Sequence, residues 1–538
     1  MSQVKEYLQN TAARIPLSAE IYQRYFSRGG TPTYGYSLEN LNDVLPAWTA
    51  AVEKLTESAN PTPRRRILVI GYLKWWLECA AAVSLVLASQ GHQVDLGFLP
   101  YRDWKTPVPL FDVRRQRTYL RMILSTMRNL INLHDLSASQ SEVLPAELVH
   151  LLEEQSRIDV QYSKMREDLD LREGSADADL YQLRLERNQT AAANTLHLLE
   201  EATYDTIVIP NGSILEFAAI YQTAKFLNAN VITYEFGEQR ERIWLAQNDE
   251  IMRLDTTSLW KAEGEKVLSK KHEEDLRHLY RARRGGRTWE NFSRQWQTAE
   301  SEEAREALAE LGIDPEKPVV LLCTNVVGDS LALNRQIFTD GMADWLKMTV
   351  NYISERPDAQ LIVRVHPAEL ILAGNPSVEI VQDTFPDLPG NVVVIPPESK
   401  INTYDLIELA HLGLVYTTTV GMEMAMSGVP VITAGRSHYR GRGFSTDPST
   451  AEEYLEAING RLAEPRDRRL GEDQVELAIR YAYLFFFEYP FRFPWHLLQF
   501  WEDMAERPLE KVIQPGEIST YDETLNVLLD DPIVREWP

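Results

Sequence analysis

The stretch His411–Gly435, HLGLVYTTTVGMEMAMSGVPVITAG, decides the fold of the second half of the chain. Its apolar run Leu412–Tyr416 is typical of a buried strand, and the polar run Thr417–Thr419 follows directly. A helical segment then ends at Ser427–Gly428, before a second apolar run, Val429–Thr433. This order of strand, loop, helix and strand predicts an α/β fold with a parallel sheet.

The threonine-rich loop predicts an anion site. The hydroxyls of Thr417, Thr418 and Thr419 lie where a strand ends and a helix begins. Anions bind there because the first helical N–H groups are unpaired and the helix dipole is positive. Glu423 follows in the first helical turn, where it can accept hydrogen bonds from sugar or ribose hydroxyls. Ordinary helix capping by threonine stays the alternative.

Composition limits the class of protein. With 538 residues the chain is expected to form two or more domains. A net charge of −24 argues against a nucleic-acid partner, which requires clustered Lys and Arg. Cys79 and Cys323 stand far apart in apolar surroundings, which fits a reducing compartment. The N-terminus lacks a signal pattern and no long apolar run occurs, so we expect a cytoplasmic protein without a membrane-spanning helix.

A second α/β pattern precedes the first. The apolar run Ile67–Ile70, a helical segment Trp76–Ser89 and the apolar run Val94–Leu99 predict a β–α–β start. Only Gly71 stands in the connecting loop, whereas a dinucleotide fingerprint needs three glycines. A nicotinamide or flavin cofactor is therefore not expected.

Polar residues follow two later strands of this first domain. Asn211, Gly212 and Ser213 come after one apolar run, and Glu235 ends the next. Parallel strands bring these residues to one edge of the sheet, where a carboxylate can serve as general base or nucleophile. A helix cap or a loop salt bridge is the alternative for Glu235.

Residues 112–200 have a helical composition. The apolar residues from Leu120 to Ile131 keep a 3.6-residue period, which predicts one amphipathic helix. Five arginines decorate it, namely Arg114, Arg115, Arg117, Arg121 and Arg128. They are consistent with a membrane or acceptor surface, or with a packed helix whose charged face is solvated. The acidic pairs at 168–170 and 177–179 are interpreted as surface charge, and no metal is predicted there.

The second domain continues the strand–loop pattern. Apolar runs at 319–323, 361–365 and 392–395 predict further parallel strands. Polar loops follow two of them, at Thr324–Ser330 and His366–Glu369, and should share an edge with the threonine-rich loop. Arg436, Arg440 and Arg442 come later and suit phosphate or an acidic sugar, or else pair with local carboxylates.

The C-terminal region is aromatic. From Tyr481 to Trp501, 11 of 21 residues are Phe, Tyr or Trp, against 9% in the whole chain. Pro490 and Pro494 exclude a spanning helix. The segment is predicted either to pack back onto the body or to form a membrane-interface patch.

Several motifs resemble a known family. LIVRVHPAE (361–369), TTTVGMEMAMSGVPVITAG (417–435) and HYRGRGFSTDP (438–448), in this order, resemble capsule polysaccharide biosynthesis proteins. TNVVGDS (324–330) and the IVIPNGS and ITYEFG segments (207–213 and 232–237) are also similar. That family contains bacterial glycosyltransferases of the two-domain GT-B architecture, some of which transfer Kdo. The resemblance covers roughly residues 211–454.

The resemblance implies an α/β fold with two Rossmann-like domains that face a cleft. Expected segments are an N-terminal extension at 1–63, an acceptor-side domain at 64–282 with a helical insertion at about 112–200, a linker at 283–312, a nucleotide-sugar-binding domain at 313–480, and an aromatic segment packing on the body at 481–538.

The resemblance also implies site roles. His366 and Pro367 would contact the base and ribose of a nucleotide sugar, and the three threonines would hold its phosphate. Glu235 or Asp329 would be the catalytic carboxylate. Phe236 stands where the Kdo branch has an acidic residue. The remaining donor-binding candidates are Asn325, Arg364, Gly421 and Glu423, and those for acceptor or phosphate are Asn211, Gly212, Ser213, Arg440 and Arg442.

The implied function is transfer of a sugar from a nucleotide-sugar donor to a glycan or lipid-linked acceptor in bacterial surface polysaccharide synthesis. No metal and no cofactor are expected, since the nucleotide sugar is a co-substrate. Peripheral contact with the inner face of the cell membrane stays open. Two alternatives are kept: a nucleotide-sugar epimerase of the same architecture, and a catalytically inactive protein that binds or assembles glycans.

Overall fold

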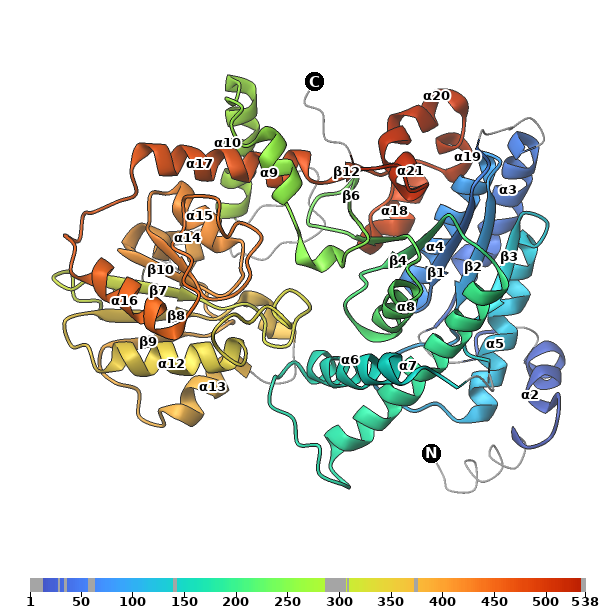
Figure 1. Cartoon of the computed structure of the whole chain (residues 1–538), viewed down its shortest axis with the longest axis horizontal. Helices are drawn as coiled ribbons and strands as arrows, with labels where there is room; N and C mark the ends of the chain where they lie inside the picture. The colour runs from blue at the N-terminus through green and yellow to red at the C-terminus, as the bar shows by residue number, and fades with distance from the viewer. Residues whose placement is uncertain are drawn as a thin grey trace. The chain divides into compact units, whose positions relative to one another are not determined.

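The computed structural model describes residues 13–27, 30–32, 36–56, 63–138, 143–285, 306, 309–371 and 376–533. The chain divides into two compact units (Figure 1). Unit 1 lies within Met1–Val160, Asp170–Met252 and Phe491–Val534, and unit 2 comprises Gln161–Leu169 and Arg253–Pro490. Residues 286–305, 307 and 308 of the expected linker lie outside the described residues.

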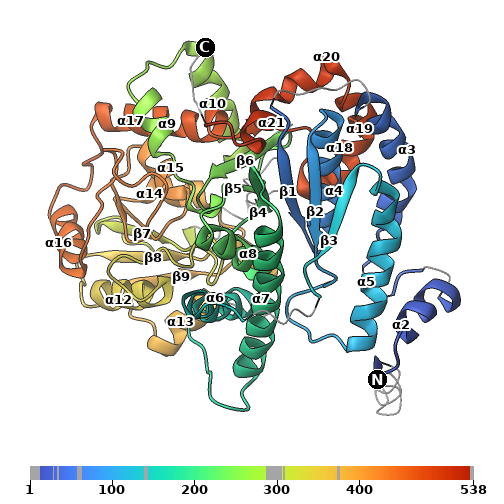
Figure 2. The ribbon, with the colours of Figure 1, turned by 45° about the vertical axis from the view of Figure 1, so that its right-hand side comes forward.

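Unit 1 is built on a seven-stranded sheet of order β12-β6-β5-β4-β1-β2-β3. The strands from β6 to β3 can be followed in Figure 2. The chain runs from β1 to β2 and β3 on one side, then returns to place β4 and β5 on the other. The direction of winding therefore reverses between β1 and β4, as in a doubly wound fold. The parallel strands are β1 Arg66–Gly71, β2 Gln93–Phe98, β3 Ile131–Asp135, β4 Thr206–Pro210 and β5 Val231–Glu235, and the antiparallel ones are β6 Arg242–Gln247 and β12 Phe491–Arg492.

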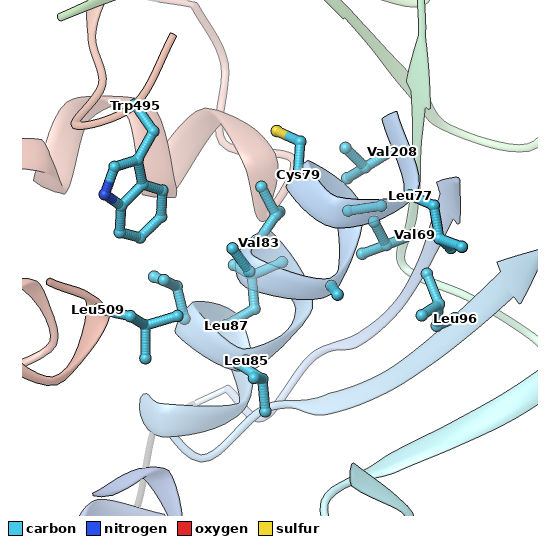
Figure 3. Close-up of a cluster of buried hydrophobic side chains, with 14 of the residues drawn as sticks. Val69, Leu77, Cys79, Val83, Leu85, Leu87, Leu96, Val208, Trp495 and Leu509 are labelled. Atoms are coloured by element: carbon cyan, nitrogen blue, oxygen red, sulfur yellow. The ribbon is translucent and has the colours of Figure 1, made fainter. Parts of the chain in front are cut away.

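Helices of unit 1 cover this sheet. Helix α4, Lys74–Ser89, is buried along nearly its whole length because its sequence is almost uniformly apolar. Cys79, Val83 and Leu87 of α4 share a core with Trp495 and Leu509 from the C-terminal segment (Figure 3). The other helices of unit 1 are α2 Ser18–Ile21, α3 Glu39–Thr56, α5 Leu110–Leu124, α6 Ala146–Lys164, α7 Ala176–Glu201, α8 Leu215–Phe226, α18 Phe500–Glu506, α19 Leu509–Val512, α20 Pro515–Ile518 and α21 Asp522–Leu528. The last residues of helix α6 belong to unit 2.

The predicted long amphipathic helix is wrong at its end. Helix α5 stops at Leu124, and Ser125–Met127 forms a 3₁₀ turn. Ile131 starts strand β3 and pairs with Val94 of β2. Ile131 fits the 3.6-residue spacing by coincidence, because it is buried as a residue of strand β3 and not as part of a helix face.

The arginines of α5 belong to a packed helix. Arg117 Nε and Arg121 Nη2 lie 2.7 and 3.1 Å from Asp135 Oδ2. Arg114 pairs with Glu20, and Arg115 with Asp112. These ion pairs favour the packed-helix alternative over an open basic surface.

The interpretation of the acidic pairs as surface charge is wrong for one residue. Asp168 is exposed, but Asp177 is only 3% exposed. The Asp177 carboxylate accepts the Asp170 N–H at 3.0 Å, at the start of α7. It therefore fixes the turn that precedes this helix.

Unit 2 contains a five-stranded parallel sheet of order β11-β10-β7-β8-β9. The winding again reverses, here between β7 and β10. Both units are thus doubly wound and Rossmann-like, and the expected α/β class is confirmed. The strands are β7 Val319–Cys323, β8 Gln360–Arg364, β9 Val392–Ile395, β10 Leu412–Val415 and β11 Val431–Thr433, and the helices are α9 Thr257–Glu263, α10 Lys270–Arg284, α12 Met342–Ser354, α13 Pro376–Thr384, α14 Thr403–Leu409, α15 Val420–Met426, α16 Ala451–Leu462 and α17 Glu472–Tyr483.

The aromatic C-terminal segment is mostly buried. Tyr481 and Phe485 lie in the interior of unit 2, whereas Phe491, Trp495 and Phe500 belong to the unit 1 core. This burial favours packing on the body over an exposed membrane patch. Within the described residues, no helix is both long and apolar enough to span a membrane.

Candidate functional site

The loops predicted to share an edge in unit 2 start side by side. Cys323, the last residue of β7, pairs with Val415 at the end of β10 and with Arg364 at the end of β8. The β7–β10 pair is also where the winding of the sheet reverses. In open α/β sheets, ligands bind at this kind of point, outside the carboxyl ends of the strands.

The threonine loop is tied to the β7 loop. Thr417 donates its N–H to Asn325 Oδ1 at 3.1 Å and its hydroxyl to the Leu331 carbonyl at 2.9 Å. Tyr439 donates its hydroxyl to the Thr418 carbonyl at 2.8 Å. A Cβ at Gly421 would collide with that tyrosine hydroxyl. The glycine thus lets Tyr439 approach, and the Thr417 hydroxyl already has an acceptor.

Three other polar groups at this edge have no hydrogen-bond partner among the described residues. They are Asn325 Nδ2, Thr418 Oγ1 and Ser437 Oγ, from residues 7%, 8% and 7% exposed. They follow β7, β10 and β11, which are adjacent in the sheet. Only the Ser437 oxygen is itself fully buried, and a buried polar group without a partner costs about 1–3 kcal/mol, which a polar ligand would recover.

Ser437 was missed by the sequence analysis. Its loop borders the threonine loop, because a Cβ at Gly435 would lie 2.9 Å from Thr417 Cγ2. The sequence carried one signal for Ser437, because the loop after β11 leaves the parallel sheet at the same edge as the other predicted site loops.

Arg364 is a buried cation without a counter-ion among the described residues. It is 3% exposed and donates to the Pro396 carbonyl at 2.9 Å and to Thr403 Oγ1 at 3.4 Å. Burial lowers the pKa of its guanidinium to about 10, so it stays protonated at neutral pH. A buried charge of this kind is stabilised by an anionic ligand.

His366 is neutral at physiological pH. Burial and the nearby Arg364 lower its pKa to about 4. Its Nδ1 accepts the Ala368 N–H at 3.1 Å, so the neutral ring carries its proton on Nε2. Pro367 begins the 3₁₀ turn Pro367–Ile371 that orients the ring. An uncharged ring suits contact with a base or ribose better than contact with phosphate.

Glu423 is held inside unit 2. It is 1% exposed, and its Oε1 accepts from Arg283 Nε at 2.7 Å and from the Tyr404 hydroxyl at 3.0 Å. These partners fix the carboxylate at the start of α15. Its contact with a sugar hydroxyl stays a prediction.

The two later arginines hold loops of the protein itself. Arg440 donates to Thr433 Oγ1 at 3.1 Å and to the carbonyls of Asp447 and Pro448. Arg442 Nη2 donates to the hydroxyls of Thr256 and Thr257 at 3.2 and 3.0 Å. Their partners are hydroxyls and carbonyls, rather than the carboxylates expected in the alternative.

Asp329 sits in a tight turn of the β7 loop. Gly328 has φ +76°, and a Cβ there would lie 2.8 Å from the Gln161 carbonyl. Asp329 itself is half-buried and accepts the Ser330 hydroxyl at 3.2 Å. The turn thereby sets the position of the carboxylate.

Unit 1 brings its own predicted residues together. Asn211 Nδ2 donates to Glu235 Oε2 at 2.9 Å, and Ser213 N–H donates to Asn211 Oδ1 at 3.1 Å. The turn between them needs left-handed backbone at Asn211 and Gly212, with φ 59° and 81°. A Cβ at Gly212 would lie 2.7 Å from Thr233 Cγ2, so glycine is required there.

A buried ion network behind this turn was also missed. Asp159, Arg184 and Glu216 are fully buried, with Arg184 Nη2 lying 2.8 Å from Glu216 Oε2. Asp159 Oδ1 accepts the Leu215 N–H at 2.6 Å and thereby fixes the start of α8 just beyond Ser213. The partners lie on three separate helices, so no local pattern announces them.

Phe236 is a core side chain. It is 8% exposed and packs against Trp76, Phe493 and His496 with ring-centroid distances of 6.1, 5.9 and 5.3 Å. An acid at this position would be buried among aromatic rings. Among the described residues, no group of three or more His, Cys, Asp or Glu side chains is arranged to hold a metal ion.

Comparison with known families confirms the resemblance for part of the chain. Residues 275–484 match the family described as "Capsule polysaccharide biosynthesis protein". The matched range contains the loops after β7, β8, β10 and β11. No curated protein matches the chain.

Solved structures are similar only remotely. KpsC, a β-Kdo 2,4 transferase of Thermosulfurimonas dismutans, is 16% identical with a TM-score of 0.33, over 61% of this chain and 87% of that chain. The UDP-GlcNAc 2-epimerase of Neisseria meningitidis is 12% identical with a TM-score of 0.24, over 77% and 94%. The ADP-heptose lps heptosyltransferase II of E. coli is 11% identical with a TM-score of 0.22, over 74% and 98%. Structural similarity this low does not indicate whether this chain transfers a sugar or epimerises a nucleotide sugar.

Proposed function

We propose that this chain is a glycosyltransferase of bacterial surface polysaccharide synthesis. It would move a sugar from a nucleotide-sugar donor to a glycan or lipid-linked acceptor, without a metal ion. The family match over residues 275–484 supports the link to capsule synthesis. The observation that carries the proposal is that Asn325, Thr418 and Ser437 place three polar groups without a hydrogen-bond partner among the described residues at one edge of the sheet, the Ser437 hydroxyl being fully buried.

The donor is proposed to bind at the reversal point of the unit 2 sheet. The hydroxyls of Thr418 and Ser437 would bind its phosphate oxygens, and Arg364 would supply positive charge for the leaving phosphate. His366 would contact the base or ribose. Helix α15 has only seven residues, so hydroxyls and the guanidinium contribute more here than the helix dipole.

The acceptor is proposed to bind at the edge of the unit 1 sheet. Glu235 would act as general base or nucleophile, with Asn211 holding one of its carboxylate oxygens at 2.9 Å. Asp329 of unit 2 is the other candidate carboxylate. If the acceptor is lipid-linked, the protein would act on it at the cytoplasmic face of the membrane. It would then contact that membrane peripherally.

One observation favours a second candidate function. Phe236 replaces the acid that the Kdo branch carries, and its aromatic surroundings leave no place for one. A protein that binds glycans without catalysis would tolerate this change. The two functions differ in nucleotide binding, which makes that the first property to measure.

The test is thermal stability with CMP, UDP, GDP and dTDP. A nucleotide present at 100 times its Kd should stabilise the wild type by about 2.7 kcal/mol. Thr418→Ala should weaken binding roughly fivefold, since one hydrogen bond contributes about 1 kcal/mol. Arg364→Gln should weaken it more. Thr384→Ala, at an exposed threonine at the end of α13, is the matched control and should change nothing.

If none of the four nucleotides stabilises the wild type, the donor site is wrong and the glycan-binding function takes its place. Incubation with nucleotide sugars alone separates the remaining alternative. An epimerised product without acceptor would contradict transfer and indicate an epimerase.

A further inference from the structure

The segment Ala13–Ser27 packs on unit 1 by one side only. It contains α2, and the π-helical turn Tyr22–Phe26 continues that helix. Ala13 and Ala19 are buried against Phe111 of α5, and Figures 1 and 2 both show α2 beside that helix. The small side chains on this side allow a close approach to α5.

The same segment also exposes large apolar side chains. Six of the fourteen exposed large hydrophobic side chains among the described residues fall within residues 15–26. We call this set the N-terminal apolar face. Its members are Ile15, Leu17, Ile21, Tyr22, Tyr25 and Phe26, which are 56%, 63%, 47%, 44%, 69% and 74% exposed. A concentration of exposed apolar side chains in one short segment is typical of an interaction site.

The charge around this face is basic, although the chain as a whole carries −24. Arg14 and Arg24 are exposed and make no ion pair with the described residues. The nearby carboxylate of Glu20 is neutralised by Arg114, whose Nε lies 2.9 Å from Glu20 Oε1. Asp112 is likewise paired with Arg115 at 3.2 Å. Among the described residues around this face, the charges without an ion-pair partner are therefore cationic.

The aromatic residues of the face suit a boundary between water and hydrocarbon. Tyr22 and Phe26 stack with ring centroids 6.1 Å apart, and Arg115 lies over the Tyr22 ring at 5.0 Å. Tyrosine combines an apolar ring with a polar tip, and arginine extends its head to water or phosphate. Amphipathic helices with aromatic and aliphatic residues flanked by arginine lie in the interface of anionic membranes.

We propose that the N-terminal apolar face docks on an anionic lipid surface. The headgroup phosphates would meet Arg14 and Arg24, while Leu17, Tyr25 and Phe26 would enter the acyl boundary. A second copy of this chain fits less well, because a two-fold contact through this face would bring the arginines of both copies into one interface. The proposal does not depend on sugar transfer, and its test uses no donor.

The test is co-flotation of the full chain with vesicles of phosphatidylethanolamine and phosphatidylglycerol, and with phosphatidylcholine vesicles alone. Wild type should bind the anionic vesicles more tightly, and about 1 M salt should weaken binding because it screens the arginines. The double variant Leu17→Ser/Phe26→Ser should lose roughly tenfold or more in binding. The double variant Arg14→Gln/Arg24→Gln should bind both vesicle types equally weakly.

The matched control is Val267→Ser/Leu370→Ser, which removes two side chains 81% and 58% exposed elsewhere on the chain. It should bind as wild type does, and all variants should keep the wild-type circular dichroism and Tm. The proposal is overturned if wild type fails to float with anionic vesicles, or if the Leu17/Phe26 variant floats as well as the control. Loss of a dimer in light scattering with unchanged flotation would assign the face to a second copy instead.

Discussion

Single residues decide the structure of the unit 2 sheet edge at which the donor is proposed to bind. Tyr439 reaches the Thr418 carbonyl only because position 421 has no side chain. Within the described residues, the buried Ser437 hydroxyl has no hydrogen-bond partner, and the buried Arg364 has hydrogen-bond acceptors but no counter-ion. At this scale the edge combines tight backbone packing with unsatisfied side chains, which is the pattern expected of a preformed polar site.

Gly421→Ala should lower the free energy of unfolding by about 1–3 kcal/mol, because the new methyl group overlaps the Tyr439 hydroxyl and lies 2.8 Å from Val415 Cγ2. Adding Tyr439→Phe should restore part of the loss by removing the hydroxyl. Urea denaturation measures both. The control is Gly460→Ala in α16, where the added methyl group meets nothing and should stabilise slightly. An equal effect at both glycines would contradict the packing argument.

Stability should fall as the pH drops below about 6.5, partly because of His438. Burial and the nearby Arg442 lower the pKa of this histidine to about 3, and its Nδ1 lies 2.8 Å from the Tyr481 hydroxyl. The unfolded chain binds the proton near pH 6.5. The contribution is therefore fully present above that pH and decreases toward pH 3, by up to about 1.4 kcal/mol per pH unit.

His438→Gln should make this dependence shallower between pH 6.5 and 4, as urea denaturation at several pH values would show. His150→Gln is the control, since the His150 side chain is 70% exposed. Parallel curves for wild type and His438→Gln would refute the assignment.

At the scale of elements, helix starts in unit 2 depend on residues far away in sequence. Glu167 accepts the N–H groups of Met342 and Ala343 at 2.9 and 2.7 Å, which caps α12 from a segment 175 residues earlier. Burial raises the pKa of the Glu167 carboxyl, although both N–H groups favour its charged form. Gly341 precedes the helix because a Cβ there would lie 2.7 Å from the Glu167 carboxyl carbon.

Glu167→Ala should cost about 1–2 kcal/mol of unfolding free energy, as for other lost caps. The first turn of α12 should also exchange its amide hydrogens faster. Hydrogen exchange followed by mass spectrometry would show both the site and the size of the effect. Asp168→Ala removes a neighbouring carboxylate that is 91% exposed and should leave the exchange unchanged. Protection that persists at Met342 and Ala343 in the Glu167 variant would count against the cap.

At the scale of the molecule, unit 1 is completed by the end of the chain. Strand β12 adds to its sheet through Phe491, which pairs with Ile243 of β6. Trp495 and Leu509 are buried in the same core as α4 (Figure 3), and Phe500 belongs to that core as well. The C-terminal segment is therefore an integral part of the first unit.

A chain ending at Pro490 should fail to fold unit 1. Burial of each large apolar side chain contributes about 1.5–3 kcal/mol, so the loss would be on the order of 10 kcal/mol. That equals the whole stability of a typical domain. Limited proteolysis should cut rapidly within 63–252 and spare the sheet of unit 2. Full-length Trp495→Phe, which keeps most of the burial, is the control, and a truncated chain with a resistant unit 1 would disprove the prediction.

Local sequence determined the α/β class, most of the parallel strands and the loops that carry Thr418, His366 and Asn211. These features follow from short-range periodicity, because an apolar run followed by a polar loop and a helix has few other solutions. The sequence also placed Glu235 beside Asn211, because adjacent parallel strands end at one edge. The helix expected through Ile131 was wrong, since one spacing fits both a helix face and the start of a strand.

Only the tertiary structure decided which polar groups find partners. Arg440 and Arg442 are used by the protein's own loops, whereas the Ser437 hydroxyl has no hydrogen-bond partner and Arg364 has no counter-ion among the described residues. The network of Asp159, Arg184 and Glu216 and the N-terminal apolar face also emerge only on folding. The physical reason is that hydrogen bonding and burial depend on neighbours distant in sequence, while periodicity reports only the nearest ones.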